Sequence, residues 1–172
     1  MTHSNKALIV IDLQNDYFPD GNFPLWNSNA VLDQVENAIT SARRQGMPVV
    51  LVQHVVEGQS SFFQQGTPGV EIHPRIKAAA PDAPVVVKAF ADSFHQTTLE
   101  TTLQQLGVDE LLVCGMMTQN CVTHTAISKA AEKYRVSILG DCCTTVSEVL
   151  HQIALNGVST RVPVFLAAEV LA

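Results

Sequence analysis

The stretch ALIVID, residues 7–12, is a continuous apolar run that ends in a carboxylate. Such a run is typical of a strand that is covered on both faces, with its last residue at the carboxyl end of the strand. Short runs of the same kind recur at residues 48–53, 84–88, 110–115, 136–141 and 159–165. The sequence therefore predicts six strands.

Helical patterns lie between several of these runs. They cover residues 28–46, 97–107 and 145–157, where apolar side chains recur at intervals of three and four. The third pattern has an apolar stripe that consists of Val146, Val149, Leu150 and Ile153. Strands that alternate with helices predict right-handed crossovers. We therefore expect one three-layer α/β/α, Rossmann-like domain over residues 1–172, with a six-stranded, mainly parallel sheet.

Composition narrows the class of partner. The 172 residues include 10 Lys and Arg against 16 Asp and Glu, a formal charge of −6, with no basic cluster. This balance favours a small-molecule substrate and disfavours nucleic acid or a membrane surface. No apolar run approaches the roughly 20 residues of a membrane span, and residues 1–16 do not resemble a signal peptide. We expect a cytoplasmic protein with four free thiols, because the cysteines form no CxxC pair. The phosphate-binding patterns GxGxxG and GxxxxGK[ST] are missing, and we expect no cofactor.

Three reactive side chains follow predicted strands. Asp12 ends the first strand, Lys88 ends the third, and Cys121 follows the fourth across a short loop. Each alone has an ordinary explanation: a helix cap, an exposed lysine or a small buried thiol. The carboxyl ends of parallel strands, however, share one edge, where such sheets bind ligands. A cysteine nucleophile needs a proton acceptor such as a carboxylate, while a nearby ammonium and a helix N-terminus both favour the thiolate.

Four motifs in order carry a resemblance to a known family: ALIVIDLQNDYF at 7–18, GTPGVEIHP at 66–74, KAFADSF at 88–94 and GMMTQNCVTHTA at 115–126. They make the chain similar to the isochorismatase-like cysteine hydrolases, which include nicotinamidases and N-carbamoylsarcosine amidase. The resemblance implies a catalytic triad of Asp12, Lys88 and Cys121. It also implies a cis peptide bond between Met116 and Met117, and an oxyanion hole formed by the N–H groups of Met117 and Cys121.

The chain departs from the nicotinamidases at their metal site. Those enzymes carry an Asp-x-His pair beside the second strand. Here VQHVVEGQSSFF, residues 52–63, has His54 in place of the acid and Val56 in place of the histidine. His54 and His73 without a carboxylate partner make a weak metal site. We therefore expect no metal, a place in the metal-free branch of the family, and a substrate other than nicotinamide.

Several residues near the predicted site suit the binding of a small planar amide, because such pockets combine aromatic walls with a few polar groups. The candidates for substrate binding are Gln14, Phe18, Trp26, His54 and Thr118. Asp16 is expected to brace the neighbouring loop, and part of segment 54–83 to cover the site.

The pattern as a whole predicts a hydrolase that cleaves a C–N bond in a small amide or ureide through a thioester on Cys121. One alternative is a non-catalytic or redox-sensing member of the fold. Another is a vinyl-ether hydrolase of the isochorismatase type, which the presence of the thiol disfavours. Relatives in the family are often dimers or larger rings, and the apolar tail VFLAAEVLA at 164–172 can pack on a second copy. We therefore expect a homo-oligomer.

Overall fold

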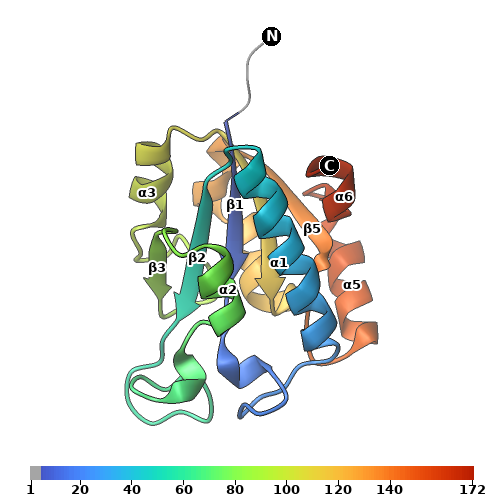
Figure 1. Cartoon of the computed structure of the whole chain (residues 1–172). Helices are drawn as coiled ribbons and strands as arrows, with labels where there is room; N and C mark the ends of the chain where they lie inside the picture. The colour runs from blue at the N-terminus through green and yellow to red at the C-terminus, as the bar shows by residue number, and fades with distance from the viewer. Residues whose placement is uncertain (1–4) are drawn as a thin grey trace.

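Six strands form one sheet in the computed structural model, which describes residues 5–172 (Figure 1). They are β1 (Lys6–Ile11), β2 (Val49–His54), β3 (Val85–Lys88), β4 (Glu110–Met116), β5 (Arg135–Thr144) and β6 (Val164–Phe165). Their order across the sheet is β3-β2-β1-β4-β5-β6, and every neighbouring pair is parallel. The predicted fold class is confirmed. The sixth strand is shorter than the predicted run at 159–165. Residues 1–4 of the predicted domain lie outside the described part of the chain.

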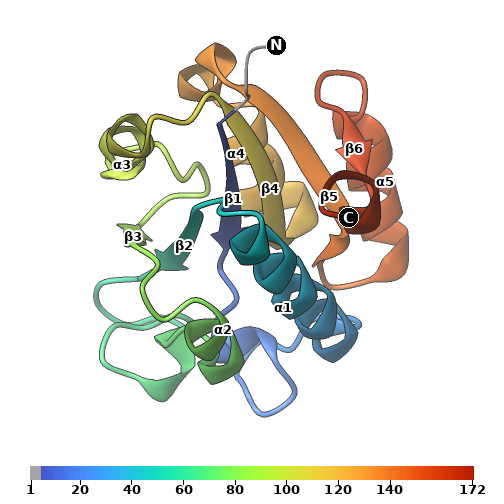
Figure 2. The same cartoon turned by 45° about the horizontal axis from the view of Figure 1, so that its top comes forward.

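Helices cover both faces of the sheet. The α-helices of the described residues are α1 (Ser28–Arg44), α2 (Pro74–Ala79), α3 (Leu99–Leu106), α4 (Thr123–Ala126), α5 (Glu148–Val158) and α6 (Ala167–Val170). Shorter turns are the 3₁₀ turns η1 (Asn15–Tyr17), η2 (Pro68–Val70) and η4 (Lys129–Lys133) and the π-helical turn η3 (Thr118–Val122). Figure 1 shows α1 and α2 in front of the sheet, and Figure 2 shows α4 behind β4. None of the helices in the described residues is long and apolar enough to cross a membrane.

The core lies around β1, which has a strand on either side. Residues 7–11 are at most 2% exposed, so the apolar run that predicted this strand is covered on both faces. On one face, α1 contributes Val35 and Ile39, which are both fully buried. A stripe of this kind stabilises the layer by removing apolar area from water, at roughly 25 cal/mol per Å².

Helix α5 does not bury the stripe that its sequence suggests. Val149 and Ile153 are 70% and 62% exposed, whereas His151 is only 6% exposed. The helix begins at Glu148, where the Ser147 hydroxyl accepts a hydrogen bond from the Leu150 N–H. Its inner face, which buries His151 and Val158, packs against η3. The apolar periodicity was therefore a correct indication of a helix and a wrong indication of its buried face.

The order of the strands reverses between β1 and β4. From β1 the chain adds β2 and β3 on one side, and then crosses to add β4, β5 and β6 on the other. In a parallel sheet, such a switch point leaves a crevice beyond the carboxyl ends of the two strands. The segment between β2 and β3 folds across this end of the molecule, at the bottom of Figure 1. The fold thus places the ends of β1 and β4 side by side under a cover.

Candidate active site

Asp12 follows β1 directly and turns its carboxylate into the protein. Its backbone has a φ of 57°, a left-handed conformation that aspartate tolerates better than most residues. Its N–H donates to the Val52 carbonyl at 3.0 Å, which holds the turn against β2. The side chain is fully buried. The end of the strand therefore presents an acid where water has little access.

Lys88 ends β3, with β2 between it and β1, and its long side chain spans this gap. Its Nζ lies 2.9 Å from Asp12 Oδ2 and donates to Cys121 Sγ at 3.2 Å. The same ammonium donates to the Phe90 carbonyl at 3.1 Å and lies 2.9 Å from His54 Nδ1. The buried Lys88 ammonium therefore contacts both the Asp12 carboxylate and the Cys121 thiol, and it also contacts the Phe90 carbonyl and the His54 ring.

Cys121 lies in the π-helical turn η3, at the end of β4. The loop can make this approach because residue 115 is glycine: its φ is 123°, and a Cβ there would lie 2.0 Å from the Ile11 carbonyl oxygen. The peptide bond between Met116 and Met117 is cis, the arrangement that the resemblance implied. The Cys121 residue is 1% exposed, so the thiol is enclosed together with the acid and the ammonium.

The charges of the three groups depend on one another. Burial by itself raises the pKa of Asp12, but the Lys88 ammonium and His54 offset this effect and the pKa lies below its usual range. Burial lowers the pKa of Lys88, and the charges of Asp12 and Cys121 reverse that shift, so its pKa is raised. Asp12 is thus an anion and Lys88 a cation near neutral pH.

The thiol behaves differently from the sequence-based expectation. Burial and the charge of Asp12 raise the pKa of Cys121 well above its ordinary value, and the Lys88 ammonium offsets only part of this rise. The Lys88 ammonium lowers the pKa of the thiol, as expected, but burial and Asp12 outweigh it in the resting site. A neutral thiol beside a carboxylate is instead arranged to lose its proton during attack.

Comparisons with known proteins agree on one family. The isochorismatase domain matches residues 6–169. The chain belongs to the isochorismatase family. The isochorismatase family protein YddQ of Bacillus subtilis is 39% identical over 142 residues, which are 82% of this chain and 78% of that protein. A streptothricin hydrolase of Streptomyces noursei is 31% identical over 164 residues, 95% of this chain and 62% of that enzyme. The crystal structure of an isochorismatase hydrolase from Oleispira antarctica has a TM-score of 0.89 and 31% identity, and covers 99% of this chain and 98% of that one.

His54 distinguishes the site of this isochorismatase-family hydrolase. It is the last residue of β2 and the register partner of Lys88 on β3. Its Nδ1 lies 2.9 Å from Lys88 Nζ and 3.8 Å from Asp12 Oδ2, so the ring contacts both members of the buried ion pair. The imidazole packs against Phe63 with ring centroids 5.9 Å apart.

A metal ion does not fit this arrangement. Among the described residues, the group of His, Cys, Asp or Glu side chains that could hold an ion is Asp12, His54 and Cys121, whose ligand atoms lie within 4.8 Å of one another. The Lys88 ammonium already lies within 3.2 Å of each of these three side chains. His73 is committed elsewhere, since its Nδ1 accepts the Arg75 N–H. Lysine thus supplies the positive charge that an ion would bring.

The candidate substrate-binding residues lie in different environments. Gln14 is fully buried, and its amide bonds to the backbone of His54, at the end of β2, and of Val70, in the middle of the covering segment. Phe18 is 5% exposed and packs on His73. Trp26 is half-buried, like His54. Trp26 and His54 therefore keep exposed surface that a ligand can contact, whereas Gln14 and Phe18 are packed inside the protein.

Thr118 connects the nucleophile turn to α5. It is fully buried, and its hydroxyl lies 2.8 Å from His151 Nδ1. Trp26 lies on the other side of this histidine, with ring centroids 6.0 Å apart. No motif in the sequence singles out His151 or its contact with the turn. A histidine on the inner face of a helix that follows the nucleophile motif gives no local signal of such a contact.

The cover of the site is anchored by Asp16, in the bracing role expected for it. Its carboxylate accepts the Phe63 N–H at 2.7 Å and the Asn22 N–H at 3.1 Å. Phe63 is fully buried and packs on Tyr17 with ring centroids 4.5 Å apart. The role of Phe63 escaped the sequence analysis, because a phenylalanine in a polar loop carries no periodic pattern that marks it as core.

Proposed function

We propose that this hydrolase is a cysteine-dependent amidohydrolase that cleaves a C–N bond in a small amide or ureide. The observation that carries the proposal is the position of one ammonium between an acid and a thiol: Lys88 Nζ lies 2.9 Å from Asp12 Oδ2 and 3.2 Å from Cys121 Sγ. Proton acceptor, cation and nucleophile are the three groups that thiol-dependent acyl transfer requires.

The proposed reaction has two halves. In the first, Asp12 takes the proton of the Cys121 thiol while sulfur forms a bond to the amide carbonyl carbon. The tetrahedral intermediate then breaks its C–N bond, Asp12 returns the proton to the departing nitrogen, and ammonia or an amine leaves behind a thioester. In the second half, a water molecule gives a proton to Asp12 while the water oxygen attacks the thioester carbonyl. The carboxylic acid product then leaves, and Asp12 returns the proton to the sulfur, which restores the thiol.

Lys88 and the turn after β4 stabilise the charges that develop. As the thiol proton leaves, the ammonium faces a forming thiolate, and its attraction offsets part of the cost of that charge in a buried site. We assign the backbone N–H groups of Met117 and Cys121 to the oxyanion, because donors fixed before reaction cost no reorganisation during it. His54 and Trp26 are proposed to contact the remainder of the substrate.

The test is ammonia release from a panel of small amides and ureides by the native protein and by Cys121→Ala. Cys142→Ala is the matched control, because it also removes a buried thiol but one on β5, away from the acid and the ammonium. The native protein and the control should release ammonia, and Cys121→Ala should be at background while unfolding at a similar urea concentration. Activity that survives Cys121→Ala would remove the nucleophile from the proposal.

Mass spectrometry of slow substrates separates the alternatives. An amidohydrolase accumulates an acyl adduct on Cys121 that water removes. A redox-sensing or non-catalytic protein shows only oxidation or alkylation of the thiol. A vinyl-ether hydrolase releases a keto acid and no ammonia. The proposal requires the first of these three results.

We further propose a homo-oligomer in the cytoplasm. Val149 and Ile153 on α5 offer apolar surface for a second copy, being 70% and 62% exposed. All four cysteines are free, as in a reducing compartment. Sedimentation of the native protein and of a Val149→Ser, Ile153→Ser variant tests the assembly: the variant should sediment as a smaller species, and an unchanged coefficient would exclude α5 as the interface.

A further inference from the structure

The charges inside the site cancel. Asp12 and Lys88 are both fully buried and form an ion pair of net charge zero. Cys121, which contacts this pair through Lys88, is a neutral thiol at rest, since burial and Asp12 raise its pKa. A ligand that carries a net charge would therefore enter an enclosed space with no opposite charge left to balance it, which costs free energy.

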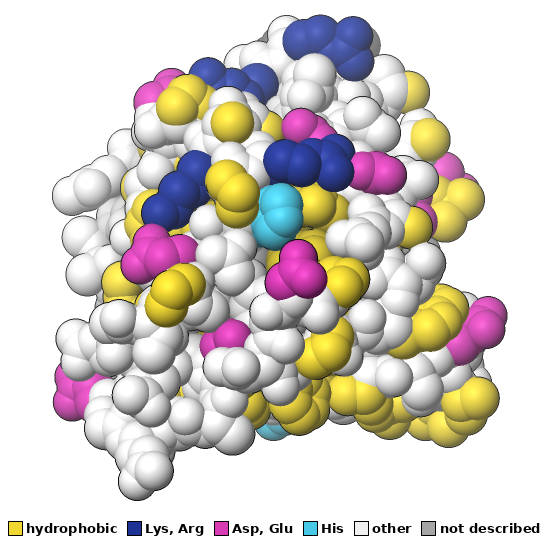
Figure 3. Space-filling view, turned by 60° about the horizontal axis from the view of Figure 1, so that its bottom comes forward, with side chains coloured by type: hydrophobic (Ala, Val, Ile, Leu, Met, Phe, Trp, Pro, Cys, Tyr) yellow, Lys and Arg dark blue, Asp and Glu magenta, His cyan; other side chains and the backbone are white. Residues whose placement is uncertain are grey.

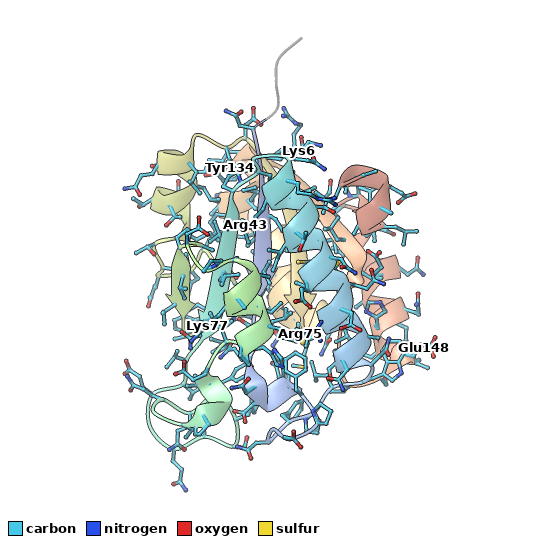
Figure 4. All side chains as sticks on the ribbon, viewed as in Figure 1. Lys6, Arg43, Arg75, Lys77, Tyr134 and Glu148 are labelled. Atoms are coloured by element: carbon cyan, nitrogen blue, oxygen red, sulfur yellow. The ribbon has the colours of Figure 1, made fainter. Side chains whose placement is uncertain are left out.

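The basic side chains nearby are already paired with acids. On α2, Arg75 pairs with Asp33 and Glu36, and Lys77 pairs with Glu71. Figure 4 shows both basic residues in the lower part of the molecule. Figure 3 shows the face of the molecule at the carboxyl ends of the strands, where basic side chains have acidic ones beside them. Both basic side chains of α2 are therefore already balanced by acids.

The basic side chains that form no ion pair, among the described residues, lie at the opposite end of the sheet. They are Arg44, at the end of α1 before β2, Lys129, on η4 before β5, and Arg161, between α5 and β6. Arg161 lines a surface hollow with Tyr134 and Val136, where β5 begins. None of the three can reach a ligand at the carboxyl ends of β1 and β4. A substrate carboxylate would thus find no dedicated cation at the site.

One buried atom also favours an N–H donor. Asp12 Oδ2 faces Lys88, but Oδ1 is buried and has no hydrogen-bond partner among the described residues. An unpaired buried acceptor is costly, and the group that relieves it must donate a hydrogen bond. A carboxamide or ureide nitrogen donates, whereas a carboxylate has only acceptors and would repel this oxygen.

We propose that the site selects uncharged primary amides or ureides and discriminates against analogues in which a carboxylate takes the place of the carboxamide. This inference rests on the proposed function for the bond that is cleaved, but the selection by charge is a property of the groups around Cys121 and can be measured without turnover. It narrows the substrate class, because amidohydrolase substrates include both neutral and carboxylate-bearing compounds.

The decisive experiment uses two electrophiles that differ only in this respect. Iodoacetamide is an uncharged primary amide and iodoacetate is its carboxylate counterpart, and both alkylate a cysteine with loss of iodide. The rate of modification of Cys121 is followed by peptide mass spectrometry with each reagent, and the ratio of the two rates is divided by the same ratio for N-acetylcysteine. We expect iodoacetamide to be favoured at least ~10-fold beyond the free thiol, given how strongly unbalanced charge acts in a buried site.

Variants locate the origin of the selectivity. Asp12→Asn removes the negative member of the pair, leaves a net positive site, and should shift the ratio toward iodoacetate by ~10-fold or more. Arg75→Gln is the control for the surface pairs, because it removes an exposed cation that is already paired, and should leave the ratio unchanged. Equal or faster modification by iodoacetate in the native protein would overturn the proposal. A site closed to both reagents would overturn it as well.

A second arm connects the inference to catalysis. Succinamide and succinamate share the scissile amide and differ in a distal carboxamide or carboxylate. The kcat/KM for ammonia release should be at least ~10-fold higher for succinamide, and a preference for succinamate would overturn the proposal. Failure to hydrolyse either compound would count against the proposed function alone, because the alkylation ratio still decides the charge selectivity.

Discussion

Lys88→Met tests the buried ion pair directly. The substitution keeps an unbranched side chain of similar length and removes the ammonium, so that Asp12 stays buried without its counter-charge. At 2.9 Å and an effective dielectric constant of about 20, the lost attraction is about 6 kcal/mol. The variant also avoids the cost of removing the ammonium from water, and this saving offsets part of the lost attraction. We expect a net loss of about 3–5 kcal/mol in the free energy of unfolding at pH 7.

The loss should depend on pH in a defined direction. In the native protein the pKa of Asp12 is lowered, so its contribution to stability is present above the unfolded value of about 3.9 and is lost as the pH falls through the lower folded value. In the variant, burial remains and the ammonium is gone, so the folded pKa of Asp12 should lie above 3.9. The stability of the variant then falls as the pH rises, by about 1.4 kcal/mol for each unit of that shift.

Urea unfolding followed by circular dichroism at pH 7 and at pH 4.5 measures both effects. The difference between native protein and variant should be largest at pH 7 and should shrink toward pH 4.5. Lys77→Met is the matched control: its pair with Glu71 is about half exposed, and its loss should cost less than about 1 kcal/mol. Asp12→Asn combined with Lys88→Met should recover much of the stability, because no unpaired charge remains buried.

Two results would refute this reasoning. A cost of Lys88→Met below about 1 kcal/mol at pH 7 would mean that the pair is hydrated or loosely held. A double variant no more stable than Lys88→Met would mean that the cost arises from packing around the lysine and not from the unpaired carboxylate.

Three further predictions concern the backbone, the thiol and the absence of a metal requirement. Gly115→Ala places a Cβ 2.0 Å from the Ile11 carbonyl oxygen at a φ of 123°, and should lower the free energy of unfolding by at least about 2 kcal/mol and abolish ammonia release. Gly157→Ala on α5 is the control, because its new Cβ meets nothing within 4 Å and should not destabilise the protein. Equal urea midpoints for the two variants would contradict this prediction. Because burial and Asp12 raise the pKa of Cys121, its rate of alkylation by iodoacetamide should still increase above pH 9, and a plateau below pH 8 would show a thiolate at rest. Ammonia release should be the same before and after exhaustive dialysis against EDTA, since Lys88 lies where an ion would bind; loss of activity that zinc restores is the opposing result.

Much of the fold could be predicted from local pattern. A buried parallel strand needs an uninterrupted apolar run, and each of the first five runs became a strand within two residues of its predicted start, with β5 continuing through Thr144. The sixth run gave only Val164–Phe165. Its first part completes the turn after α5, and a short edge strand carries too few residues for a pattern to mark its limits.

The positions of Asp12, Lys88 and Cys121 were also determined by the sequence, since parallel strands joined by helices deliver their carboxyl ends to one edge. How these groups meet was decided by tertiary structure. The reversal of strand order sets β1 beside β4, and Lys88 reaches Asp12 across β2 only because its side chain is long enough. The protonation of the thiol followed from burial and from Asp12, which act through space and leave no mark in the local sequence.

The clearest divergence between pattern and structure is on α5. Its sequence determined a helix, because apolar residues recur at helical intervals, but which face turned inward was decided by what lay beneath it. The turn that carries Cys121 offered the Thr118 hydroxyl to His151, and the helix turned Val149 and Ile153 toward solvent. Local sequence fixes the conformation of a segment through short-range sterics and hydrogen bonding. The orientation of that segment, and with it the shape and charge of the site, depends on partners that are distant in the chain and are brought together only by folding.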